Sequence, residues 1–486
     1  MTDRSLTVYQ DNHLRVAFEH HAAAFYGPMV QASRAHVVML AEQGLVPGDR
    51  AATLLRGLEN LATDDPATLT YDGSVEDVYF TMEHRLAEAC EIAPAELDVQ
   101  MARSRNDLDQ GIFRMILRDQ LIAVHSAALA ACTAVLDAAE RDADVVIVGY
   151  THRRPAQPTT IGHVLAGYAE ALVGQAQAYT ALLDQINVSP LGACAFAGTD
   201  LDIDSTRVAE LLGFDGVVLN SYEAVAGADH LVRVGTLNAQ ALATGARLAR
   251  TLMDWLSWQW VTTPQEFTQG SSIMPQKRNP VVLEHLVSMA GATAADAASV
   301  LNNVGAAWWE DSNNATTDVQ ARLWDSNDRA ERFFRLVGGF IAQIEPLAPP
   351  GAEQIVATGA TTTAAADALT AFGVPFRAAH SIVGRLVRAA DPAEWDVAMV
   401  LDTAAAIGQP GVSEQAAAEL IAAATDPHRV ARRQQPDGPG AEQVRHQVNQ
   451  LRASLGRTEE HVSGLRARLA TAAGSLDAAV RKWITA

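Results

Sequence analysis

The chain has 486 residues, ample length to bury a hydrophobic core without disulfide or metal staples. Its 36 basic and 57 acidic residues give a net charge of −21, which disfavours nucleic-acid and anionic membrane partners. Three widely separated cysteines exclude a disulfide framework and a cysteine-ligated zinc site. The N-terminal stretch MTDRSLTVYQDN lacks the apolar core of a signal peptide, and we see no run of about 18 apolar residues. We therefore expect a cytoplasmic globular protein.

Apolar residues recur at helical spacing through most of the chain. Up to about residue 105 these patterns are short, with breaks at 46–49 and 64–66. Longer helical patterns then follow at about 108–143, 160–186, 228–260, 281–304 and 325–344. A short apolar stretch at 145–148 and a Gly-Tyr break separate the first two. Long helices with short connections indicate an antiparallel bundle, and their apolar circumference suggests packing between subunits as well.

The patterns become shorter again after about residue 351. A QQPDGPG loop at 434–440 then precedes a last helical segment, which we interpret as a docked helix rather than a coiled coil. We predict an all-α fold with three mostly helical domains. They are an N-terminal domain at 1–107, a central long-helix bundle at 108–350 and a C-terminal domain at 351–486.

The stretch GSSIMPQKRNP at 270–280 is the most unusual in the chain, and its place between two long helices predicts a loop. Its hydroxyls, ammonium and amide, with the backbone N–H groups, can be directed at one anion. Lys277 is one of only two lysines among the 36 basic residues, and lysine differs from arginine where a compact ammonium is needed. By chemistry alone, the segment could equally be a polar connection that caps a helix.

This loop, 269–280, resembles the GSSxMPxKxNP signature of the fumarase/aspartase superfamily. SRND at 104–107 and GYTHxxxAQP at 149–158 resemble elements of the argininosuccinate lyase branch. Weaker agreements at 190–192, 219–221 and 373–377 extend the resemblance over roughly residues 30–450. It implies no metal and no organic cofactor. It also implies a homotetramer with a twenty-helix core, in which each active site combines residues from three subunits.

The resemblance further implies a carbon–nitrogen lyase acting on a small dicarboxylate, an N-substituted L-aspartate. A base removes the Cβ proton, the carbanion is held as an aci-carboxylate, and the amine leaves to give fumarate. The reverse reaction adds an amine to fumarate. Fixed cations and N–H dipoles suit the intermediate, because they need not reorganise as its charge develops.

Matching the family's motifs residue by residue implies a role for each position. Ser271 is the base, which needs a nearby cation and loop N–H groups to lower its pKa. Lys277 and Asn279 hold the carboxylate that becomes the aci-form. His152 assists the departing amine, and Glu284 orients its ring. The implied substrate-binding positions are Ser104, Arg105, Asn106, Thr151, Asn279, Ser272, Met274, Gln157, Asp77 and Tyr79.

Three segments depart from the argininosuccinate lyase pattern. Tyr79 stands where the family usually has a histidine, AWWEDSNNA at 307–315 replaces a stretch with a tyrosine, a glutamine and a lysine, and Ala228 replaces an arginine. The changes spare the succinyl half and fall on positions that face the leaving group. They predict the same elimination with a different amine. The two tryptophans and the added acid suggest a larger or cationic amine, although the tryptophans could equally pack the bundle.

Two alternatives remain open at this point. The chain could be an ordinary argininosuccinate lyase with a divergent arginine pocket, or a catalytically silent structural homologue. Joint retention of Ser271, Lys277, Asn279, His152 and Glu284 argues against a silent homologue, because a relic could lose any of them without unfolding.

Overall fold

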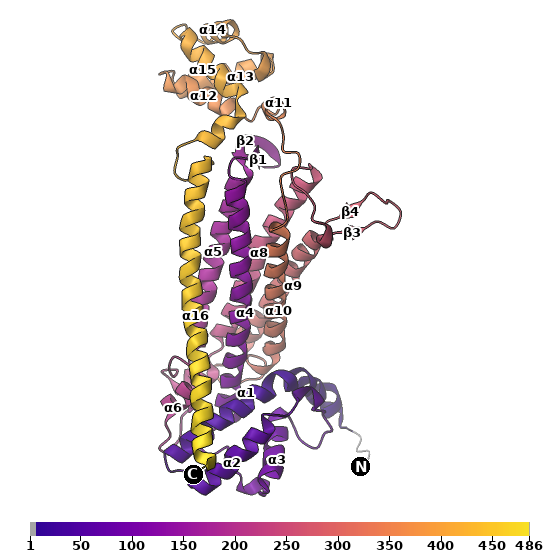
Figure 1. Cartoon of the computed structure of the whole chain (residues 1–486), viewed down its shortest axis with the longest axis vertical. Coiled ribbons are helices and arrows are strands. Elements are labelled where there is room, and N and C mark those ends of the chain that lie inside the picture. The colour runs from indigo at the N-terminus through magenta and orange to yellow at the C-terminus, as the bar shows by residue number, and fades with distance from the viewer. Residues whose placement is uncertain (1–5, 486) are drawn as a thin grey trace.

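Long helices that run along the longest axis of the molecule form its centre (Figure 1). They are α4 (Arg105–Arg141), α5 (Ile161–Ile186), α8 (Asp229–Ser257), α9 (Val281–Ala306) and α10 (Thr317–Ile341). Their inward faces share one apolar core, in which Phe333, Phe334 and Phe340 of α10 are almost completely buried. The structure, a computed structural model that describes residues 6–485, confirms the all-α fold with a long-helix bundle.

The start of α4 lies at Arg105, three residues before the start that the apolar pattern predicts. Ser104 Oγ accepts a hydrogen bond from the Asn106 N–H at 3.2 Å, and Asp107 Oδ1 accepts one from the Ser104 N–H at 3.0 Å. This reciprocal pair is a capping box. The SRND stretch therefore encodes a helix start, which the apolar periodicity alone does not reveal.

The start of α10 also precedes its predicted position, by eight residues. The inward face of this helix carries Gln320, Ser326 and Asn327, all of them buried. Asn327 accepts a hydrogen bond from the Asn238 side chain of α8 at 2.7 Å. Of these, Gln320 lies in the first turns, where its side chain donates to the Thr316 carbonyl oxygen at 3.0 Å. A buried polar residue there interrupts the apolar period, so the pattern hides the start of the helix.

A β-hairpin joins α4 to α5, where the sequence predicts only an apolar stretch and a break. β1 (Val146–Thr151) pairs antiparallel with β2 (Arg154–Thr160), and a two-residue turn connects them. The turn residues His152 and Arg153 have φ angles of +50° and +62°. Positive φ at both central residues is the requirement of a type I′ turn, whose twist matches that of a hairpin.

Three N-terminal helices lie across the base of the bundle (Figure 1). They are α1 (Arg15–Glu42), α2 (Gly48–Leu61) and α3 (Val78–Cys90), and they form an apolar cluster with the first turns of α4. With 28 residues, α1 is as long as the bundle helices, in contrast to the short patterns predicted for this region. Gly27 and Pro28 interrupt the sequence pattern, but the helix continues through Pro28.

Short helices at the opposite end of the molecule form a separate apolar cluster. They are α12 (Thr362–Ala371), α13 (Phe376–Ala389), α14 (Val397–Ala406) and α15 (Glu414–Thr425), preceded by α11 (Ala352–Ala357). α16 (Ala441–Thr485) then returns along α4 and α5 to the base, as the docked-helix interpretation predicts. Because α16 joins the clusters of both the bundle and the N-terminal helices, the domain division at 107 and 350 stays a prediction.

Within residues 6–485, α4 is the helix that is long and apolar enough to cross a membrane, by length and composition alone. In the fold, 61% of its most apolar window is buried inside the protein. Its apolar side chains are therefore used for packing in the bundle.

A close contact between the end of α4 and the start of α5 allows the packing of the bundle to be tested. A Cβ at Gly162 would stand 2.4 Å from the Ala139 carbonyl oxygen and 2.5 Å from Ala143 Cα. Since these are backbone atoms, Gly162→Ala should force the helices apart and lower the free energy of unfolding by about 1–3 kcal/mol, measured by urea denaturation.

The matched control is Gly174→Ala on the same helix, where an added Cβ meets nothing within 4 Å. That substitution should leave stability unchanged or raise it by up to about 1 kcal/mol, as helix propensity favours alanine. Equal stability of the two variants would show that α4 and α5 are not in backbone contact at Gly162.

Candidate active site

The predicted site residues lie in three separate parts of the chain. Ser104, Arg105 and Asn106 are at the N-terminal end of α4, at the base of the bundle, whereas His152 lies beyond the other end of this helix (Figure 1). The signature loop lies between α8 and α9. Since α4 has 37 residues, it spans about 55 Å. One chain therefore cannot bring Arg105 and His152 to the same small substrate.

The signature loop is anchored by a minimal hairpin. β3 (Gln269–Gly270) pairs antiparallel with β4 (Arg278–Asn279), and the residues between them extend away from the bundle (Figure 1). Ser272, Met274 and Lys277 are all exposed. The functional groups of the loop are therefore directed away from the bundle of their own chain.

Ser271 has the surroundings of an activated hydroxyl in one respect. Its Oγ accepts hydrogen bonds from the backbone N–H groups of Met274, at 3.0 Å, and Ile273, at 3.4 Å. N–H dipoles directed at this oxygen favour its deprotonated form. A serine base also needs a nearby cation. Lys277, on the same loop, does not supply one to Ser271, because its side chain makes no hydrogen bond or ion pair with any described residue.

The β1–β2 hairpin holds His152 at its exposed tip. The left-handed backbone of this residue costs about 1–2 kcal/mol for a side chain other than glycine, and such conformations cluster at functional sites. Arg153 forms a two-pronged ion pair with Asp254 at the end of α8, at 2.5 and 2.9 Å. Tyr150 stacks on Trp258, with ring centroids 4.9 Å apart. These contacts fix the tip of the hairpin on α8.

Three further predicted residues belong to the hairpin or to the helix that follows the signature loop. Thr151 and Gln157 are exposed on the hairpin, and Glu284 is exposed in the first turn of α9. Within residues 6–485, no hydrogen bond between Glu284 and His152 is recorded. The orienting role of Glu284 therefore stays a prediction.

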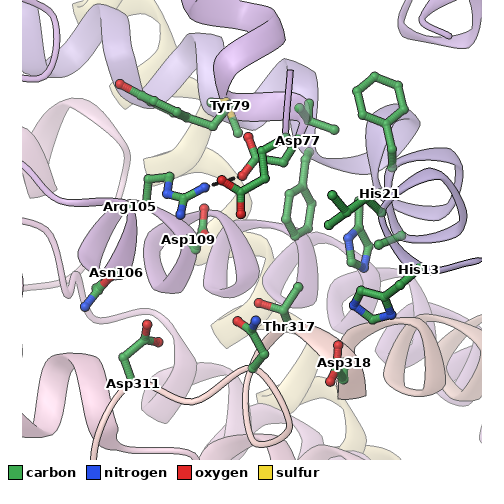
Figure 2. A pocket seen from close by; sticks show the side chains of 18 of the residues that line it. His13, His21, Asp77, Tyr79, Arg105, Asn106, Asp109, Asp311, Thr317 and Asp318 are labelled. Carbon is green, nitrogen blue, oxygen red and sulfur yellow. Dashed lines mark hydrogen bonds and ion pairs between the residues drawn. The ribbon is translucent and has the colours of Figure 1, made fainter. Parts of the chain in front are cut away.

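A cavity of about 160 Å³ at the base brings four other predicted residues together (Figure 2). Asp77, Tyr79, Arg105 and Asn106 all line it, although they come from two segments that are distant in the sequence. Asp77 caps α3 through the Phe80 N–H at 3.1 Å and forms an ion pair with Arg105. The Arg105 guanidinium also lies 5.3 Å from the centre of the Phe80 ring. The structure therefore places one predicted substrate-binding cluster at the N-terminus of α4.

The hydroxyl of Tyr79 does not serve as a polar group of this cavity. Its hydroxyl donates a hydrogen bond to Glu83 Oε1 at 3.0 Å, and its ring is buried. Burial raises the pKa of the Tyr79 hydroxyl above its ordinary value. Tyr79, which stands in place of the family's histidine, thus contributes its ring to the cavity, while its hydroxyl is bound by Glu83 of the same helix, α3.

Asp107 connects this end of α4 to the loop that follows Pro190. Its Oδ2 accepts hydrogen bonds from the Gly192 and Cys194 N–H groups at 3.0 and 2.9 Å, in addition to the cap at Ser104. Asn106 Nδ2 donates to the Ala195 carbonyl oxygen of the same loop at 3.2 Å. The capping box therefore positions the SRN residues against a second segment of the chain.

Sequence reasoning missed four acidic residues of the cavity: Glu76, Asp109, Asp311 and Asp318. Burial, together with repulsion from Asp77 and Asp311, raises the pKa of Asp109 to about 7. Burial also raises the pKa of Asp311. A signal for Asp109 was available, because it follows Arg105 by four residues and therefore shares its helical face. Asp311 lies in the 307–315 segment, but nothing in the sequence places it opposite α4.

Trp308 and Trp309 do not pack the core of the chain. They are 77% and 58% exposed, and they line a second cavity of about 470 Å³ with Asp229 and Arg233 of α8. The 307–315 segment therefore reaches both cavities, because Asp311 lines the first. The three segments that depart from the family pattern meet around the base of the bundle.

The described residues include no group of three or more histidine, cysteine, aspartate or glutamate side chains that could hold a metal ion. The arrangement offers instead a positioned hydroxyl, an exposed imidazole, a lysine and an arginine. These are the groups for proton transfer and for stabilising a carboxylate that gains charge.

Comparison with known proteins agrees with the motifs. Residues 19–294 match the family described as Lyase, and residues 359–420 match Argininosuccinate lyase C-terminal. The chain is 32% identical to argininosuccinate lyase 2 of Agrobacterium fabrum, covering 93% of this chain and 91% of that one. It is 35% identical to argininosuccinate lyase of Natronomonas pharaonis, covering 93% and 90%.

Solved structures show the same relationship. The crystal structure of EDDS lyase in complex with formate has a TM-score of 0.83 and 31% identity, covering 96% of this chain and 93% of that one. A class II fumarase from Schistosoma mansoni has a TM-score of 0.69 and 13% identity, covering 84% of this chain and 91% of that one, and shares the fold.

The crowded carboxylate of Asp109 predicts a pH-dependent stability. Its pKa of about 7 in the folded protein exceeds the ordinary 3.8, so folding favours the protonated form. This contribution is fully present below about pH 4 and is lost as the pH rises through about 7. Relative to Asp109→Asn, the wild type should lose on the order of 2 kcal/mol over this range, measured by urea denaturation. A constant or rising difference would contradict the burial of Asp109.

Proposed function

The chain belongs to the lyase family, in its argininosuccinate lyase branch, and we propose that it eliminates fumarate from an N-substituted L-aspartate whose amine is not arginine. One observation carries the proposal. Arg105 and Asn106, which match the family's residues for the succinyl half, share a cavity with Tyr79 and Asp311, which belong to the departing segments. The fumarate-forming half is thus retained next to an altered amine side.

The reaction follows from the groups available. The Ser271 oxygen, with its charge stabilised by two loop N–H groups, takes the Cβ proton of the substrate. The electron pair of that C–H bond passes into the adjacent carboxylate, which Lys277 and Asn279 hold as the aci-form. The pair then forms the C=C bond of fumarate as the C–N bond breaks. The amine leaves with the electrons of that bond and takes a proton from His152 or from water.

Assembly of several chains is part of this proposal. The 55 Å or so between the two ends of α4 require that Arg105 and His152 of a working site come from different copies. The middle of α9 exposes small residues, which allow close contact with another helix. They are Gly291, Ala292, Ala294, Ala295 and Ala298. We propose a homotetramer in which three chains contribute to each site.

Two candidate functions differ in the amine that leaves. The relatives named argininosuccinate lyase are 32% and 35% identical to the chain, and the EDDS lyase structure is 31% identical, so overall similarity does not choose an amine. The altered 307–315 segment, with exposed tryptophans, favours an amine other than arginine. Ordinary argininosuccinate lyase activity is the second candidate, because the C-terminal match is to that family.

The three unpaired cysteines, Cys90, Cys132 and Cys194, suit a reducing compartment. We place the enzyme in the cytoplasm as part of the same proposal.

Direct assay of fumarate distinguishes the candidates. Purified protein should release little fumarate from argininosuccinate, followed by ultraviolet absorbance, but should consume fumarate when supplied with a suitable amine. Ser271→Ala should lower the rate at least about 100-fold, because the loss of a general base typically costs 10²–10⁴-fold. Robust release from argininosuccinate that depends on Ser271 would instead establish the second candidate.

Mixing inactive variants tests whether sites are shared between chains. Arg105→Ala and Ser271→Ala should each be inactive, yet co-expression should restore about a quarter of the activity, since each site draws the two residues from different copies at random. The matched control combines Ser271→Ala with Lys277→Ala. Because these residues lie on one loop, every loop is then defective and no activity should return. Absence of recovery in the first mixture would contradict a shared site.

A further inference from the structure

The solvent-facing side of α13 combines positive charge with apolar side chains. Arg377, Arg385 and Arg388 are exposed there, and they are all the lysines and arginines of the short C-terminal helices, α11 to α15. Phe376 and Val387 lie along one edge of the same face and are 54% and 47% exposed. We call these five residues the α13 face.

Nothing in the same chain covers the α13 face. The opposite side of the helix, with Ala379, Ile382 and Leu386, already fills the core of the short helices. Among the described residues, no ion pair of the three arginines is recorded. An apolar and basic helix face that is left unpaired, on a chain with a net charge of −21, indicates a surface for a partner.

A surface of complementary character lies at the base of the molecule, beside the start of α1. Val8 and Tyr9 are 81% and 60% exposed. Glu76 and Asp318 are also exposed, they line the base cavity together with Tyr9, and no ion pair of either is recorded within residues 6–485. These four residues, which we call the base face, place unpaired carboxylates next to apolar side chains.

The proposed function brings the two faces to the same end of an assembly, and the inference rests on it. Arg105 of one copy and His152 of another must meet at one substrate. The hairpin that holds His152 contacts the short helix Pro427–Arg432, which connects the C-terminal helices to α16 (Figure 1). A copy that brings its hairpin to the base of a second copy therefore brings its α13 to that end as well.

We propose that the α13 face of one copy docks on the base face of a second copy. The arginines then lie against Glu76 and Asp318, while Phe376 covers the exposed side chains that precede α1. The opposite charges fix the orientation of the contact, and the apolar residues supply the surface that is removed from water. Because the base face borders the cavity that contains Arg105, the docked helix also covers that part of the site.

Carbodiimide coupling tests this contact, because the reagent joins a lysine to a carboxylate with which it is in contact. The only native lysines are Lys277 and Lys482, so the wild type measures a low background. The variant Arg377→Lys/Arg385→Lys/Arg388→Lys keeps the charge of the α13 face and adds three reactive amines. It should give at least about threefold more cross-linked dimer than the wild type, since salt-bridged groups are within coupling distance. Mass spectrometry should identify Glu76 or Asp318 as the joined residue.

Arg432→Lys is the matched control. This exposed arginine lies at the same end of the molecule but outside α13, and its partner Asp426 belongs to the same chain, at 2.6 Å. Its lysine should couple within the chain and leave the dimer yield at the wild-type level. Adding Glu76→Gln/Asp318→Asn to the triple variant should remove at least about half of the extra dimer, as should 1 M salt, in which the screening length is about 3 Å.

The outcomes distinguish this contact from the proposed function. Fumarate-forming activity without a lysine-dependent dimer, or a dimer joined at carboxylates away from the base face, would overturn the docking and leave the lyase function intact. A dimer joined at Glu76 or Asp318, in a protein that neither releases nor consumes fumarate, would support the docking although the proposed function fails. A monomer in light scattering would overturn the docking together with the shared site.

Discussion

The length of the central helices is the constraint on which the arrangement of the site depends. A rigid helix such as α4 keeps its two ends about 55 Å apart, and the SRND residues and the β1–β2 hairpin lie at opposite ends of it. A substrate of a few ångströms can therefore meet both groups only where chains lie side by side. The exposed signature loop, which extends from the bundle, fits the same requirement.

Each part of the proposed site is fixed locally before any chains assemble. A capping box and the Asp107 contacts hold the start of α4, a type I′ turn holds His152, and two backbone N–H groups hold the Ser271 oxygen. Groups that are positioned in advance need not reorganise when charge develops on the substrate. Local hydrogen bonding thus positions each of these groups on its own chain, independently of the proposed assembly.

The sequence supported the long helices and the motifs far better than the boundaries between elements. The positions of α5, α8 and α9 followed the apolar period closely, because their inward faces are apolar. The starts of α4 and α10 did not, because a polar cap and buried polar residues interrupt that period. Tyr79 illustrates a similar limit for the site: its identity signals a change from the family, but its hydroxyl bonds to Glu83.

By itself, the sequence determined the helical class and the family and predicted the residues of the site, because apolar periodicity and contiguous motifs are local properties of the chain. Only the tertiary structure decided that Asp109 and Asp311, 202 positions apart in the numbering, face one cavity with Arg105. It also placed Trp308 and Trp309 on the surface. Which side chains of distant segments meet depends on how helices pack, and packing is a property of the whole fold that no single segment encodes.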